Sequence, residues 1–470
     1  MKAISNGTLI MKKFAKNTLF IFLSFIIFTQ ILDLIGWLTD DEPVEKDALT
    51  KIEKINPSEN GYEFIKFMDE PNFRLLNESF DNKILKNLLI NEQWNDIEVK
   101  KVLDNHLKYQ NIISEVNSKP FFQSKIIESY LHSFSAYFRY SELLSLKLIE
   151  SRSYAENNDI NKAIKSTEQA LIFSQRLKAN MSPTLISFLT GLSHQDQILS
   201  WLHKLATAYN TNDDQLTALL TLTNTVSDYI DDNFDAVISG EFYFSELIRN
   251  EMFNFSSLNQ RFDLLQITSY GSDEKTVSEV IYNFLTFLSP HYFFQTQKNS
   301  NAMYLYRTKD SESVRTSCKS ISYSHYPNEV KNHSFFNTFK LNAAGSSFTS
   351  QSSVSFKKYF LRRCQADFHL QAVKAAIAIT LFESKNNREI QKLESLVPTI
   401  IKNPLVDATT NEGLRFNPEK RWLYSQGINF SDNNGSLETI YNSSCHHSTA
   451  CQNNPTVPIA HVTTPQYTHE

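Results

Sequence analysis

The acidic segment 226–253, "VSDYIDDNFDAVISGEFYFSELIRNEMF", holds the side chains best suited to acid–base chemistry. Paired carboxylates can act as general acid and base or bind a cation. At helical spacing its aspartates share one side, opposite Tyr229 and Phe234, which is the pattern of a solvated helix face. We therefore expect a solvated face, with a hydrolase centred on this segment as the alternative. The carboxylates in question are Asp228, Asp231, Asp232, Asp235, Glu241 and Glu246.

Four cysteines allow either two disulfides or a small metal site. Cys445 and Cys451 predict a short disulfide loop, which leaves Cys318 and Cys364 as the remaining pair. The stretch "CHHSTAC" at 445–451 adds two adjacent histidines, but this spacing matches no standard zinc pattern. We therefore expect a disulfide or free thiols here rather than a metal centre.

The sequence contains no recognisable catalytic motif. It lacks a Walker A loop, a G-x-S-x-G elbow, an HExxH helix and a G-x-G-x-x-G turn. With 10 glycines in 470 residues, a loop that cradles phosphate has few places to form. His369 lies in a helical pattern at 357–384 and is expected to be a core or surface histidine rather than a catalytic one. We therefore predict no enzymatic activity, no cofactor and no small-molecule substrate.

The first forty residues have the pattern of an uncleaved signal anchor. The apolar run 18–38 is long enough to cross about 30 Å of hydrocarbon as a helix, and Asp33 near its far end is its one charged residue. The basic segment 1–17 is expected to stay in the cytoplasm, while the acidic residues after the run are exported. A cleaved signal peptide would end in small residues of the A-x-A kind, which the run lacks. Release of a soluble exported protein after cleavage is the alternative.

Residues 45–340 are expected to form an α-helical exported domain. Leucine, phenylalanine and tyrosine recur at spacings of three and four before "NND" at 157–159, and a second helical pattern follows. Ala163 and Ala170 share one face of that second helix and would let a neighbour approach closely. The pair resembles a tetratricopeptide-like helical hairpin. A weak echo at 212–226 is not at a fixed period, so no repeat array is predicted.

The C-terminal part predicts a small α+β unit at 357–436. The Ser-rich stretch 341–356, "LNAAGSSFTSQSSVSF", is expected to be a polar loop that separates this unit from the helical domain. The helix 357–384 has a small apolar face, against which another element must pack closely. Turn residues and two short strands joined at 417–420 then predict a β-hairpin, and 437–470 reads as an extended or disordered tail. The turn residues before the strands are Asp407, Asn411 and Gly413.

An ordered set of residues in this unit resembles the C-terminal part of type II secretion major pseudopilins. It is still more similar to a group of uncharacterised bacterial envelope proteins that join an N-terminal anchor and a helical region to such a tail. With the signal anchor, the resemblance implies a single-pass protein of the bacterial inner membrane, with a cytoplasmic N-terminus and a periplasmic bulk. The matching residues are Leu393, Leu396, Val397, Pro398, Pro404, Asp407, Leu414, Arg415, Phe416, Leu423, Tyr424, Ser425, Gly427, Asp432 and Gly435.

Several departures from the pseudopilin pattern limit what the resemblance implies. Major pseudopilins bind calcium in the final loop, where this chain offers Asn429, Asp432 and Asn434 with a single carboxylate. Low ligand charge makes these weak calcium ligands, so a structural Asx turn is expected and no metal. The chain also has no prepilin cleavage site before its apolar run and no glutamate early within it. Assembly into a pilus is therefore not expected.

Composition decides which classes of partner are expected. A net charge of −5 argues against general nucleic-acid binding, which needs a basic face. A chain of 470 residues with 41% hydrophobic residues is folded and large enough for two or three domains. Paired helices expose extended surfaces suited to protein contacts. We therefore predict a membrane-anchored envelope protein that binds or scaffolds other envelope proteins, with an envelope hydrolase as the alternative.

Overall fold

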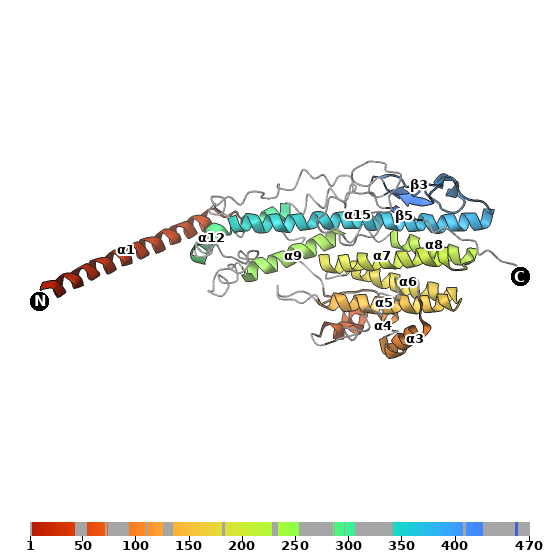
Figure 1. Cartoon of the computed structure of the whole chain (residues 1–470), viewed down its shortest axis with the longest axis horizontal. Helices are drawn as coiled ribbons and strands as arrows, with labels where there is room; N and C mark the ends of the chain where they lie inside the picture. The colour runs from red at the N-terminus through yellow and green to blue at the C-terminus, as the bar shows by residue number, and fades with distance from the viewer. Residues whose placement is uncertain are drawn as a thin grey trace.

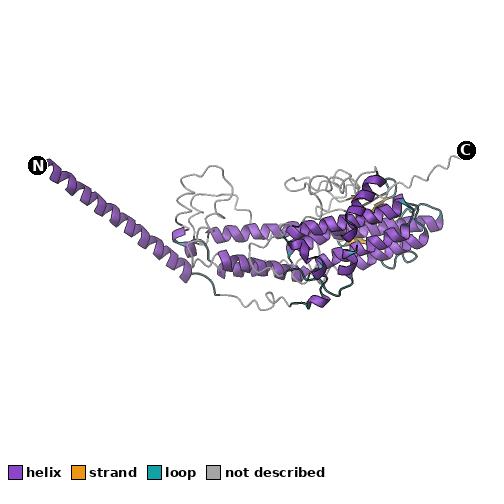
Figure 2. Cartoon of the chain, turned by 90° about the horizontal axis from the view of Figure 1, so that it is seen from below, coloured by secondary structure: helices purple, strands orange, loops and turns teal. Residues whose placement is uncertain are grey.

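The computed structural model describes most of the helical part of the chain. The described residues are 2–42, 54–70, 73, 94–109, 111–125, 135–180, 184–227, 234–252, 285, 287–295, 297–305, 341, 343–407, 410–425 and 456–458. The described chain is mostly helical, with two small antiparallel sheets, which confirms the predicted mainly-α class. Its helices run roughly parallel to one long axis, so the molecule is elongated (Figures 1 and 2).

Helix α1 (Lys2–Leu38) contains the run predicted to be a signal anchor. Its portion Lys16–Leu38 is long and apolar enough to cross a bilayer. The helix projects alone from one end of the bundle (Figure 1). Its apolar side chains are largely exposed, with Phe20 at 71% and Trp37 at 63%. An apolar surface of this extent is a site for lipid or for another protein.

Four helices form the centre of the bundle. The hairpin predicted around 157–159 is present as α5 and α6, and α7 packs against both of its helices. The echo predicted at 212–226 is also a helix, α8, which contacts α6 and α7. Ala163 and Ala170 are fully buried, so the small face of α6 is used for close packing. The bounds are α5 (Ser135–Glu156), α6 (Ile160–Lys178), α7 (Leu185–Ala208) and α8 (Asp213–Ser227).

Local capping explains where these helices begin. Asn158 takes a left-handed φ of 59°, which ends α5, and the Asp159 carboxylate accepts a hydrogen bond from the Lys162 backbone N–H at the start of α6. Thr184 and Ser187 form a reciprocal capping box on α7. Each cap satisfies backbone donors that have no partner within the helix.

Helix α15 (Ala343–Asn386) is the spine of the molecule. Its 44 residues extend about 66 Å at 1.5 Å per residue. It packs along α7 and α8 through alanines that are completely buried, which confirms the expected close approach. Figure 1 shows it running from the end that carries α1 to the opposite end. These buried alanines are Ala372, Ala375, Ala376 and Ala378.

The prediction of a Ser-rich loop at 341–356 is wrong from Ala343 onward, because this stretch forms the first turns of α15. The stretch contains no proline, and its single glycine, Gly345, lies in the first turn. Serine lowers helix propensity only modestly, so a long helix that is anchored further along can extend through it. The helix therefore continues across the predicted boundary, and one hydrophobic core joins residues from Tyr62 to Leu423.

Short helical elements cover the far side of α5 and α6. Helix α4 contacts α6, and α3 contacts α5. The Asp69 carboxylate connects this region to α5, because it accepts hydrogen bonds from the hydroxyl of Tyr62 and from the hydroxyl of Tyr140 in α5. The elements are η1 (Pro57–Glu59), η2 (Gly61–Phe64), η3 (Lys66–Asp69), α3 (Asp96–Asn105), η4 (Leu107–Tyr109) and α4 (Ile112–Asn117).

The C-terminal unit packs on the last turns of α15. It begins with η7 (Leu393–Leu396), and its first hairpin pairs β1 (Val406–Asp407) with β2 (Glu412–Gly413). The predicted hairpin is present as β3 (Arg415–Asn417) paired with β4 (Trp422–Tyr424). The first hairpin was not predicted, and neither was β5 (Thr456–Pro458), which comes from the predicted tail and pairs antiparallel with β4. The described sheets are therefore small and lie against one end of the helical spine.

Candidate functional site

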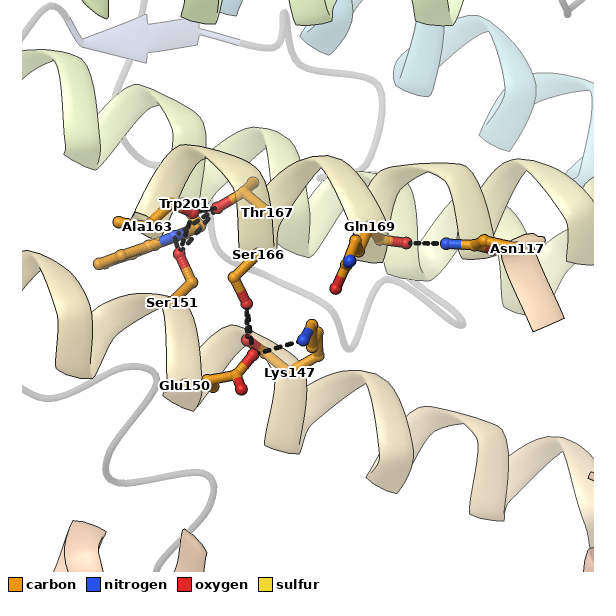
Figure 3. Close-up of polar contacts among 9 residues, drawn as sticks. All are labelled: Asn117, Lys147, Glu150, Ser151, Ala163, Ser166, Thr167, Gln169 and Trp201. Carbon is orange, nitrogen blue, oxygen red and sulfur yellow. Dashed lines mark hydrogen bonds and ion pairs between the residues drawn. The ribbon is translucent and has the colours of Figure 1, made fainter. Parts of the chain in front are cut away.

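A buried polar cluster joins α5, α6 and α7 (Figure 3). The indole Nε1–H of Trp201 donates to Ser151 Oγ at 2.8 Å and lies 3.1 Å from Thr167 Oγ1. Ser151 Oγ in turn donates to the Ala163 carbonyl oxygen at 2.8 Å. Because these polar atoms satisfy one another inside the core, the cluster fixes the register of the three helices rather than offering a reactive group.

The ion pair of Lys147 and Glu150 lies on α5 beside this cluster (Figure 3). Its N–O distance is 2.5 Å, and Ser166 Oγ of α6 donates to the same carboxylate at 2.7 Å. A neighbouring cavity has about 10 Å³ of free volume, which holds at most one water molecule. It is therefore too small to receive a substrate.

Ser141 of α5 and His194 of α7 form a pair that resembles an activated nucleophile. Ser141 Oγ lies 2.6 Å from His194 Nε2, and it donates to the Tyr137 carbonyl oxygen at 3.2 Å. The Tyr137 carbonyl oxygen therefore competes with the imidazole for the serine proton. Burial also lowers the pKa of His194 to about 3, which is too low for a general base near neutrality. The pair is a structural contact.

A charged seam lies between α7 and α15. The Asp196 carboxylate pairs with Arg362, and its Oδ1 is 3.2 Å from His369 Nδ1. His369, expected to be structural, therefore joins two helices through a carboxylate on the neighbouring helix. Burial and, to a smaller extent, the nearby His369 lower the pKa of His203 to about 4. Two histidines near one carboxylate do not form a metal site, because no group of three metal-ligating side chains occurs among the described residues.

Lys178, at the end of α6, is a buried cation close to this seam. Its ammonium group donates to the Gln195 side chain, and burial lowers its pKa to about 8, against the opposing effect of Asp367 and Asp196. A lysine with a lowered pKa can act as a nucleophile if a substrate reaches it. Lys178 is 4% exposed and packs against Gly191 of α7, so this lysine is closed to substrate.

The acidic segment proposed for hydrolysis is described only in part. Asp228, Asp231 and Asp232 lie outside the described residues, and Asp235 begins α9 (Phe234–Met252) without a described side chain. Glu241 accepts a hydrogen bond from the Leu185 backbone N–H at 2.6 Å. Glu246 accepts one from Ser300 Oγ at 2.5 Å. These two carboxylates hold different elements, so the described part of the segment forms no shared acid–base centre.

The predicted calcium ligands Asn429, Asp432 and Asn434 lie outside the described residues, as does the predicted disulfide between Cys445 and Cys451. Cys364 is the cysteine that the structure describes. It lies in α15, is 1% exposed and is disulfide-bonded. The expected partner, Cys318, is not described, so this pairing stays a prediction.

An open hollow lies on the C-terminal unit. It has a volume of about 560 Å³ and lies between η7 and the strands that follow it. Two leucines and one phenylalanine line it together with one glutamine, one lysine and one glutamate. The lining residues are Gln391, Lys392, Leu393, Glu394, Leu414 and Phe416.

The last turns of α1 form a junction with a segment more than 250 residues further along the chain. Helix α12 (Pro290–Phe293) packs on α1, where the Asp33 carboxylate accepts hydrogen bonds from the His291 backbone N–H at 2.7 Å and lies 3.0 Å from His291 Nδ1. Gly36 permits this contact, because a Cβ there would lie 2.3 Å from the His291 backbone. Asp33 is therefore a partnered residue rather than a flaw in the apolar run.

Comparison with known protein families, with curated proteins and with solved structures finds no match to this chain. The pseudopilin-like and tetratricopeptide-like resemblances therefore stay predictions from the sequence.

Sequence reasoning missed both the charged seam and the junction at α1. The seam involves residues on helices more than 150 positions apart, Asp196 on α7 and Arg362 and His369 on α15. The junction had a signal: an aspartate and a glycine within an otherwise bulky apolar run. An ionisable residue in such a run marks a place where a polar partner is required.

Proposed function

We propose that this protein is a single-pass, membrane-anchored envelope protein whose exported helical bundle serves as a scaffold for other proteins. One observation carries the proposal: the apolar portion Lys16–Leu38 of α1 projects from the bundle with most of its side chains exposed. Lipid is the environment that covers an isolated helix of this length and polarity. The bacterial inner membrane and the periplasmic location of the bulk belong to this proposal.

The shape of the bundle supports a scaffolding role. Helix α15 leads from the end that carries α1 to the end that carries the small sheets, about 66 Å away. The small sheets lie at that far end (Figure 1), and the open hollow lies between them and η7, where a partner is reached at a distance from the bilayer. The buried polar groups of the bundle are engaged in holding helices together, which is consistent with a binding role rather than catalysis.

Two measurements test the anchor and its orientation. The full chain is expected to stay with membranes after carbonate extraction. A reporter that folds only outside the cytoplasm, fused after Glu470, is expected to be active. Release by carbonate, or activity only of a cytoplasmic reporter, would overturn the proposal. N-terminal sequencing of the membrane-bound protein separates a retained anchor from a cleaved signal peptide.

A third measurement tests the scaffolding role at the far hollow. A photo-crosslinking amino acid replaces Phe416, which lines the hollow, or Thr217, an exposed residue of α8 that serves as the matched control. Crosslinks to a specific envelope protein are expected from position 416 and absent from position 217. Equal, unspecific crosslinking from both positions would argue against this surface as the binding site.

A further inference from the structure

We propose that residues 287–295, which include α12, are seated in the interfacial layer of the membrane together with the end of α1. The partner is the lipid itself, at the boundary between headgroups and acyl chains. This inference rests on the proposed membrane anchor and adds a second lipid-contacting segment to it. Three observations support this inference. The segment docks on α1 at a position within the apolar span, and several of its polar groups form hydrogen bonds with protein. Large apolar side chains of α1 remain exposed beside it.

The docking height follows from the hydrogen bonds between the two segments. Ser289 Oγ donates to the Thr29 carbonyl oxygen at 2.6 Å, and His291 binds Asp33. Thr29 lies nine residues before Leu38 in α1, which is about 13 Å along the helix axis. Asp33 lies five residues before it, at about 7 Å. A bilayer that reaches Leu38 therefore also contains the start of α12.

The exposed face of α1 requires the bilayer to reach Leu38. At the height of the junction, five large apolar side chains of α1 remain 41% to 65% exposed. Leaving them in water would cost free energy in proportion to their apolar area. They are Ile31, Leu34, Ile35, Trp37 and Leu38.

Placing the edge of the bilayer nearer the N-terminus of α1 does not remove the cost of these exposed side chains. If it ended at Thr29, the portion from Lys16 onward would contribute 14 residues, or about 21 Å, against about 30 Å of hydrocarbon. The missing length would come from residues before Lys16, which include Lys12 and Lys13. Lysines within the hydrocarbon are unfavourable. The sequence therefore favours the deeper position, with the junction inside the interface.

Several polar groups of the docked segment are partnered by protein, as a lipid environment demands. Non-helical backbone at membrane depth is tolerated only where protein satisfies its donors and acceptors. Here the Leu288 carbonyl oxygen accepts from Gln30 Nε2 at 3.5 Å, and the His291 N–H donates to Asp33. The Tyr292 N–H donates to the Ser289 carbonyl oxygen, and Pro290 has no N–H to satisfy. Tyr292 is partly exposed, and tyrosine is typical of the membrane interface.

After residue 295 the chain leaves the proposed membrane layer and forms hydrogen bonds with Asp40. The Asp40 carboxylate accepts hydrogen bonds from the backbone N–H groups of Gln297 and Lys298, at 3.0 and 2.8 Å. This caps the helical segment 297–305 beyond the end of α1. These contacts lie two residues beyond Leu38, where the apolar span ends, and they join the helical segment 297–305 to the end of α1.

The experiment uses the unaltered full chain in phosphatidylcholine–phosphatidylglycerol vesicles that contain a lipid with a diazirine near the carboxyl end of its acyl chain. After illumination, peptides are mapped by mass spectrometry. Lipid adducts are expected on peptides from α1 and on the peptide that contains 287–295. Adducts on α1 alone would overturn this inference and leave the anchor intact. Adducts on neither peptide would overturn both proposals.

Two glycine variants then test whether docking on α1 seats the segment. Gly36→Ala places a Cβ against the His291 backbone, so adducts on 287–295 are expected to fall at least fivefold while those on α1 persist. Gly413→Ala is the matched control, because no heavy atom lies within 4 Å of its added Cβ, and it is expected to change neither peptide. Unchanged labelling of 287–295 in Gly36→Ala would contradict the proposed docking.

Discussion

At the scale of single residues, the ion pair between Arg421 and Glu383 connects the C-terminal hairpin to α15. The guanidinium binds the carboxylate through two nitrogen–oxygen contacts, at 2.6 and 2.8 Å. Arg421 adopts a left-handed φ of 57° to place its side chain there. The Glu383 carboxylate raises the pKa of Arg421, so the guanidinium keeps its charge. The pair holds a strained turn against the helix.

Replacing this arginine by lysine is expected to destabilise the protein. Arg421→Lys keeps the charge and the unfavourable φ but loses the two-fold contact, so we predict a loss of about 1–2 kcal/mol in the free energy of unfolding, measured by denaturant titration. Arg415→Lys on the same hairpin is the control, because Arg415 and Glu412 are 3.8 Å apart and partly exposed. Equal effects of the two substitutions would contradict the importance of the paired contact.

His194 gives the protein a predictable dependence on pH. Burial lowers its pKa to about 3, whereas in the unfolded chain it is about 6.5. The stability contributed by the neutral imidazole is therefore complete above pH 6.5 and is lost as the pH falls toward 3. We predict that His194→Gln removes up to about 1.4 kcal/mol per pH unit from the slope of stability between pH 6 and 4. Denaturant titrations of both proteins across this range measure it, and an unchanged slope would show that His194 is protonated in the folded state.

At the scale of elements, Gly191 sets the distance between α6 and α7. A Cβ at this position would lie 2.4 Å from Lys178 Cγ and 2.9 Å from the Ser174 carbonyl oxygen. Gly191→Ala must therefore push the two helices apart, and we predict a loss of about 1–3 kcal/mol in thermal or denaturant unfolding. Gly413→Ala has open space around its added Cβ and is expected to stay within about 0.5 kcal/mol of the unaltered protein. A larger effect at Gly413 than at Gly191 would refute this packing argument.

The sequence predicted elements well where local rules decide them. Spacings of three and four identified the hairpin of α5 and α6, and the break at 157–159 coincides with a left-handed Asn158. Turn residues placed the hairpin of β3 and β4 correctly, with Asn411 in a left-handed conformation just before it. The Ser-rich stretch was misjudged because packing further along α15 outweighs its weak local preference.

The long-range contacts were not predictable in the same way. Strand β5 has no periodic signal, since its three residues are defined by pairing with β4 rather than by their own pattern. The seam at Asp196 and the junction at Asp33 each unite residues from distant parts of the chain. A single sequence shows that a buried charge needs a partner, but it does not identify that partner.

At the scale of the whole molecule, α15 connects regions that the sequence assigned to separate units. Its first turns lie near α12 and the end that carries α1, and its last turns support the small sheets (Figure 1). Between them it fills the core shared with α7 and α8. One continuous helix therefore connects the two ends of the molecule.

The disulfide at Cys364 in α15 indicates which kind of compartment the protein resides in. Cys364 is buried and disulfide-bonded, and such bonds persist in oxidising surroundings outside the cytoplasm. We predict that peptide mapping of the protein from native membranes, denatured without reductant, finds Cys364 oxidised and paired with Cys318. Cys364→Ser and Cys318→Ser are each expected to lower the free energy of unfolding by about 2–4 kcal/mol.

Two comparisons separate this prediction from a general effect of cysteine loss. Reductant should lower the stability of the unaltered protein by more than it lowers that of Cys364→Ser, because the variant has already lost the bond at Cys364. Cys445→Ser should leave the bond at Cys364 intact if the predicted pairing is right. Complete alkylation of Cys364 in the denatured, unreduced protein would show a free thiol, and it would contradict both the bond and the exported location of α15 that the bond supports.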